Sequence, residues 1–81
     1  MLKNPDSPKF SLGLDFYAIM DLQVDALHQF LSFASREEII DWLQWNDRNG
    51  IYRDEESLAE FGTIVSKEEG IEIVMRQIRE G

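Results

Sequence analysis

The sequence contains no cysteine, only one histidine and no long uncharged apolar run. Without cysteine there can be no disulfide and no thiolate metal ligand, and one imidazole is too few for an ordinary zinc site. A membrane-spanning helix needs about 20 consecutive, predominantly apolar residues, and the chain has no such stretch. We therefore expect a cytoplasmic protein that holds no metal ion or cofactor and does not enter a membrane.

Basic residues are also scarce: 8 Lys and Arg stand against 16 Asp and Glu, which gives a formal net charge of -8. Phosphate backbones are bound by clustered Lys and Arg, so direct nucleic-acid binding is disfavoured. The excess is concentrated between Glu37 and Glu72, where eleven acidic residues accompany three basic ones. The simplest interpretation is solubility, but an acidic surface also suits a basic protein partner.

With 81 residues, the chain has room for a single hydrophobic core. Residues 1–9 contain two prolines and no apolar periodicity, and are predicted to be a flexible tail. Residues 10–81 are predicted to form one helical domain. Within it, residues 10–14 alternate apolar and small residues around a glycine, which predicts an extended N-terminal arm, with a short strand as the alternative.

The first two predicted helices follow from apolar periodicity and capping residues. Residues 15–35 contain neither Pro nor Gly, Asp15 is a candidate N-cap, and the apolar positions cover more than half of the helical wheel. So wide an apolar arc predicts contacts with several elements. Ser35 and Glu38 have the spacing of a capping box and predict a second helix that ends near the turn at 47–50.

A short third helix is predicted over residues 55–61. Asp54 is its candidate N-cap, Gly62 its expected end, and Leu58 and Phe61 its expected contribution to the core.

The capping-box spacing recurs at Ser66 and Glu69 and predicts a last helix that extends to about Glu80. Residues 71–73 also alternate, so a strand over 70–75 is the alternative.

Residues suited to catalysis are few. His28 lies three and seven residues beyond Asp25 and Asp21 on the polar face of the first predicted helix. Such a pairing is usual on a solvated helix, and no nucleophile and base stand together elsewhere. We expect no enzymatic activity and no catalytic residues.

The turn 47–50 resembles the middle of a calcium-binding EF-hand loop. Asp47, Asn49 and Glu56 have the spacing of ligands, but Trp45 occupies the position of the first coordinating carboxylate. We therefore expect an ordinary Asx-Gly turn between helices and no tight calcium site.

Three residues are candidates for an interface. Trp45 and Tyr52 are of the types enriched at binding hot spots, and Ile73 lies outside the apolar stripe of the last helix. Trp42, in contrast, is expected in the core.

Together, these patterns predict an all-α, small four-helix domain with an extended N-terminal arm. The function that fits best is a small acidic protein–protein interaction or regulatory protein, with an acidic inhibitor or nucleic-acid mimic as the alternative. The excess of apolar surface favours a homodimer. In the alternative monomer, the arm residues Phe10, Leu12 and Leu14 fold over the first helix.

Overall fold

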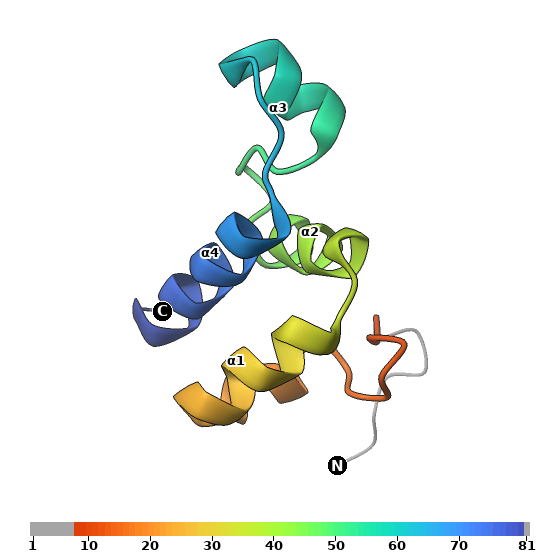
Figure 1. The fold of residues 1–81 in the computed structure, drawn as a ribbon, viewed down its shortest axis with the longest axis vertical. Coiled ribbons are helices and arrows are strands. Elements are labelled where there is room, and N and C mark those ends of the chain that lie inside the picture. The colour runs from red at the N-terminus through yellow and green to blue at the C-terminus, as the bar shows by residue number, and fades with distance from the viewer. Residues whose placement is uncertain (1–7, 81) are drawn as a thin grey trace.

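The computed structural model describes residues 8–80, and each regular element in that range is a helix (Figure 1). In chain order the elements are the 3-10 helix η1 (Ala18–Asp21) and the α-helices α1 (Val24–Phe33), α2 (Arg36–Asn46), α3 (Asp54–Phe61) and α4 (Lys67–Glu80). The predicted all-α class with four α-helices is confirmed. Most of the predicted tail, residues 1–7, lies outside the described residues.

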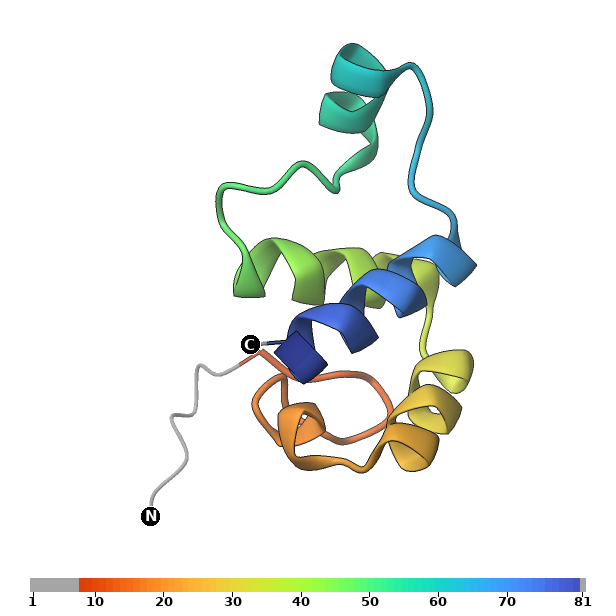
Figure 2. The ribbon, with the colours of Figure 1, turned by 90° about the vertical axis from the view of Figure 1, so that its left-hand side faces the viewer.

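Helices α1, α2 and α4 pack together into a body, and α4 lies against both α1 and α2 (Figures 1 and 2). Large side chains from these helices and from the chain before α1 fill its core, with Tyr52 added from the segment after α2. The buried apolar residues are Phe10, Phe16, Ile19, Leu27, Leu31, Ala34, Ile39, Ile40, Trp42, Leu43, Tyr52, Ile71 and Val74.

Both predicted capping boxes are present. The Ser35 hydroxyl accepts a hydrogen bond from the Glu38 amide, and the Glu38 carboxylate accepts one from the Ser35 amide. Ser66 and Glu69 repeat this exchange at the start of α4, with distances of 3.0 and 3.1 Å. Residues 70–75 are helical, so the strand alternative is excluded.

The single helix predicted over residues 15–35 is wrong. Leu22 and Gln23 have extended backbone, with ψ of 144° and 159°, and they separate η1 from α1. Asp15 is not an N-cap: Tyr17 occupies that position before η1, and the Asp15 carboxylate accepts a hydrogen bond of 2.8 Å from the Ala18 amide.

The chain before the break is held by a tertiary hydrogen bond. The buried indole of Trp42 donates a 2.9 Å hydrogen bond to the Phe16 carbonyl, which a continuous α-helix would use for its own backbone ladder. This hydrogen bond satisfies the buried indole N–H of Trp42, and both Phe16 and Ile19 lie in the core.

The predicted extended arm is a closed loop. The Phe16 amide donates to the Pro8 carbonyl at 3.0 Å, and Lys9 and Asp15 form an isolated antiparallel bridge. Gly13, at φ 107°, takes the positive φ that the turn requires.

This loop covers part of the body. The Phe10 ring is buried and lies 4.7 Å from the ring of Phe16 and 5.1 Å from that of Phe30, measured between centroids. Leu14 is half-buried, while Leu12 stays 50% exposed. The monomer alternative requires the arm residues to cover the α1 region. Phe10 and Leu14 are buried or half-buried as it requires, and Leu12 is not.

Helix α3 stands apart from the body and is joined to it by two connecting segments (Figures 1 and 2). Gly62, at φ 78°, ends it as predicted. The predicted core role of Leu58 and Phe61 is wrong, because their side chains are 54% and 67% exposed. None of the helices in the described residues is both long and apolar enough to cross a membrane.

Candidate interaction surface

The segment 54–64, here called the α3 arm, combines exposed apolar and acidic side chains. Leu58 and Phe61 are more than half exposed, and Ile64, just past the helix, is 43% exposed. Four of the eight residues of α3 are acidic and exposed: Asp54, Glu55, Glu56 and Glu60. Large apolar residues three positions apart on a helix are neighbours, so α3 presents an amphipathic surface that the described chain leaves uncovered.

Two arginines fix how α3 leaves the body. The Arg36 guanidinium contacts both carboxylate oxygens of Asp54 at the start of α3, and its Nε donates a 2.7 Å hydrogen bond to the Val65 carbonyl beyond the arm. Arg36 therefore holds the two ends of the arm at one point. Just before the start of α3, Arg53 pairs with Asp41 of α2 at 3.1 Å. The hydrogen bond to Asp54 raises the pKa of Arg36, which keeps this clasp charged.

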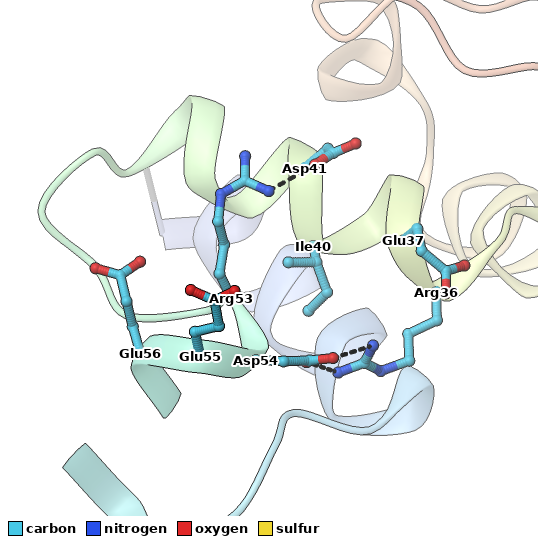
Figure 3. A pocket seen from close by; sticks show the side chains of 8 residues that line it. All are labelled: Arg36, Glu37, Ile40, Asp41, Arg53, Asp54, Glu55 and Glu56. Atoms are coloured by element: carbon cyan, nitrogen blue, oxygen red, sulfur yellow. Dashed lines mark hydrogen bonds and ion pairs between the residues drawn. The ribbon is translucent and has the colours of Figure 1, made fainter. Parts of the chain in front are cut away.

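A recess of about 420 Å³ lies between α2 and the start of α3, and Figure 3 shows Ile40 between the two ion pairs. The carboxylates of Glu37, Glu55 and Glu56 complete its rim. Among the described residues no group of three or more His, Cys, Asp or Glu could hold a metal ion. The ion pairs in the recess account for the position of α3.

A second apolar surface lies on the body, between the start of α1 and the end of α4. This α1–α4 groove has a volume of about 220 Å³ and is lined by Leu22, Gln23, Val24, Leu27, Met75, Ile78 and Arg79. Val24 is 56% exposed there, and Arg79 is the only charged residue in the lining. Ile78 also lines a neighbouring recess, together with Met20, Trp42 and the polar Asn46 and Gln77.

Trp45 and Ile73, two of the predicted interface residues, are half-buried. The Trp45 indole stacks edge-on with Phe16 at 5.5 Å and with the exposed Tyr17 at 4.7 Å. Ile73 packs against the core from α4. Both side chains already make contacts within the chain, and their role in an interface stays a prediction.

Tyr52, the third predicted interface residue, is 8% exposed. Its hydroxyl donates a 2.7 Å hydrogen bond to Asp47 and accepts one of 2.8 Å from Gln77 of α4. Burial raises the pKa of Tyr52, and the Asp47 carboxylate adds to the rise. The structure thus shows Tyr52 as the link between the turn after α2 and α4.

Leu58 and Phe61 were missed as surface candidates because a short helix with two large apolar residues is usually packed on them. The signal that marks the arm is its acidity, with four carboxylates among eight residues. Carboxylates near a helix N-terminus are also explained by the helix dipole, so this signal alone does not identify an interface.

The other sequence candidates lie on the surface or in turns. His28 is exposed on α1. In the turn at 47–50, the Asp47 carbonyl accepts from the Gly50 amide at 3.1 Å, and its carboxylate accepts from Tyr52. The absence of tight calcium binding stays a prediction.

Comparison of the chain with protein-family models, curated proteins and solved structures finds no match. The function therefore has to be inferred from the chain's own surfaces.

Proposed function

We propose that this chain is a small, acidic, non-catalytic interaction or regulatory protein of the cytoplasm, and that the α3 arm is the element that docks onto a protein partner. The observation that carries the proposal is the contrast in burial. Trp42, Leu43 and Val74 are fully buried in the body, whereas Phe61 is 67% exposed on α3, a helix in which only Ser57 is buried.

The arm suits a protein groove. Leu58 and Phe61 are spaced by three residues on α3, which is the anchor spacing of an amphipathic helix bound in an apolar groove. Ile64, beyond the end of the helix, adds a further exposed apolar side chain. Aromatic anchors contribute strongly when such a groove closes over them. The carboxylates that flank these anchors favour a groove bordered by basic side chains, and they disfavour contact with nucleic acid or an anionic membrane.

The alternative function, an acidic inhibitor that imitates nucleic acid, depends on unpaired surface carboxylates. Asp54 and Asp41 are paired with Arg36 and Arg53, which removes two charges from the acidic surface at the base of the arm. The exposed apolar anchors have no counterpart in a phosphate backbone. In 0.5 M salt the Debye length falls to only a few Å, so attraction between surface charges is screened. Partner binding that persists in 0.5 M salt therefore supports apolar docking over charge mimicry.

Crosslinking in the cells that naturally make the protein tests the proposal. A photoreactive phenylalanine analogue is placed at position 61 or, as the matched control, at Phe33, which is 70% exposed on α1. We expect one discrete protein adduct from position 61 and none from position 33. The adduct should also disappear when Leu58→Ser is added to the crosslinking chain, because the same helix face is then no longer apolar.

An adduct at position 33 with none at position 61 would assign docking to α1 and refute a role for the arm. The same conclusion follows if the position-61 adduct persists unchanged in the Leu58→Ser chain.

A further inference from the structure

We infer that the α3 arm docks into the α1–α4 groove of a second copy of this chain, so that two copies exchange arms reciprocally. This inference rests on the proposed function and names the partner. The chain carries both halves of the contact: an exposed apolar helix face on the arm and an exposed apolar groove on the body.

The groove fits the arm in size and chemistry. Leu22, Val24, Leu27, Met75 and Ile78 supply its apolar surface, and its volume is about 220 Å³. A dry apolar cavity of about 150 Å³ is enough to hold a benzene ring. The Phe61 ring can therefore enter the groove, with Leu58 on the adjoining apolar surface.

Charge favours the same pairing. Arg79 is the only charged residue in the groove lining, and Glu60 precedes Phe61 on the arm. Seating Phe61 between Val24 and Ile78 brings an acidic helix to the groove's one cation. The whole-chain charge of -8 opposes any pairing of two copies, so the apolar contact has to provide the attraction.

The shape of the chain allows the exchange to close. The molecule measures 42 Å along its longest axis; the arm lies at one end and the α1–α4 groove lies toward the other (Figures 1 and 2). A two-fold axis perpendicular to this length places each arm beside the partner's groove. The contact is then made twice, and no arm or groove is left over for further copies.

Sedimentation equilibrium of the purified chain at tens of micromolar tests the association, with variants on each side of the contact. We expect a dimer of the 9.5 kDa chain, and a dissociation constant raised more than tenfold by Phe61→Ser. Val24→Asp should have a similar effect from the groove side. It adds a carboxylate that faces the acidic arm, and an acidic residue in the first turn of α1 suits the helix dipole, so the fold is kept.

Phe33→Ser is the matched control, since it removes an equally exposed phenylalanine outside both surfaces. Raising the salt to 0.5 M should leave the dimer unchanged or tighten it, because it screens the repulsion between two acidic bodies. A dimer that dissociates in 0.5 M salt would overturn the apolar docking mode.

Disulfide trapping locates the contact, and the absence of cysteine leaves no background. A chain carrying Phe61→Cys and Val24→Cys should form a covalent dimer on mild oxidation, whereas Phe33→Cys with Val24→Cys should not. A ladder of larger covalent species would refute the closed exchange.

The inference is overturned if the chain stays a 9.5 kDa monomer, or if Phe61→Ser leaves the dimer unchanged. In that event, an in-cell adduct at position 61 to a different protein would still support the proposed docking function. If the chain is a monomer and position 61 gives no adduct in cells, both proposals are refuted.

Discussion

The body and the α3 arm are both helical, but they use their apolar residues in opposite ways. In the body, the side chains of Trp42 and Leu43 of α2 are fully buried. In the arm, Leu58 and Phe61 lie three positions apart on α3, and both side chains are more than half exposed. Helix formation and core formation are therefore separate properties of this chain.

The arm is also held differently. An isolated helix shorter than about 12 residues is marginal in water, and α3 has eight. What fixes it is the polar clasp of Arg36 on Asp54 and on the Val65 carbonyl, at the base of the arm. A helix attached by polar contacts and exposing apolar side chains is suited to a partner that covers those side chains.

The strongest test of this contrast is a pair of alanine substitutions, one in the body and one in the arm. Trp42→Ala removes a fully buried indole and its hydrogen bond to Phe16, and should cost about 3–5 kcal/mol of unfolding free energy. Phe61→Ala should cost less than about 0.5 kcal/mol in the monomer, as for an exposed residue. Urea denaturation at low protein concentration measures both, and a large loss with Phe61→Ala would show that the arm packs on the body in solution.

The glycines of the two regions should respond differently to alanine. Gly70 is buried in α4, and an added Cβ would lie 2.8 Å from Cγ2 of the fully buried Ile39. Gly70→Ala should destabilise the body by about 1–3 kcal/mol through overpacking, although alanine normally favours a helix. Gly62 has open space around it, so Gly62→Ala should cost about 1 kcal/mol through its positive φ alone. Thermal unfolding followed by circular dichroism distinguishes the two, and a more stable Gly70→Ala chain would contradict the close α2–α4 approach.

The sequence predicts the features of this fold that depend on neighbouring residues. The capping boxes at Ser35 and Ser66 need only a residue three positions away, and both are present. The left-handed Gly62 at the end of α3 is equally local. These signals suffice for the number of α-helices and for most of their boundaries.

Features that depend on distant residues were not predictable. The Phe16 carbonyl pairs with the Trp42 indole, 26 residues further along the chain, and no local signal marks that contact. The exposure of Phe61 depends on where the connecting segments carry α3, and Arg36 determines that from another helix. The sequence therefore predicts an interface at Trp45, Tyr52 and Ile73 and places Leu58 and Phe61 in the core.

Removing the clasp should loosen the arm without unfolding the body. Because the ion pair is partly exposed, Arg36→Ala should cost about 1 kcal/mol or less in global stability. Amide hydrogen exchange should nevertheless become clearly faster across residues 54–65 and stay unchanged in α4. Arg36→Lys keeps the charge but cannot make the same forked contact, so it should show most of this effect. Unchanged exchange in the arm would show that the clasp does not hold it.

A corresponding polar contact on the body side, made by Glu38, should also have a small effect. The Glu38 carboxylate accepts hydrogen bonds from the Ser11 amide at 2.6 Å and from the Ser35 amide at 3.3 Å, which lowers the pKa of Glu38. The folded-state pKa lies below the unfolded one, so this stabilisation is fully present above the unfolded value of about 4.3 and is lost as the pH falls through the folded value. Glu38→Gln keeps a capping-box side chain and removes the charge. It should cost less than about 1 kcal/mol at pH 7 and less at pH 2 than at pH 7, as measured by urea denaturation at both pH values. An equal cost at both would show that the shape of the Glu38 side chain, and not its charge, fastens the N-terminal loop to α2.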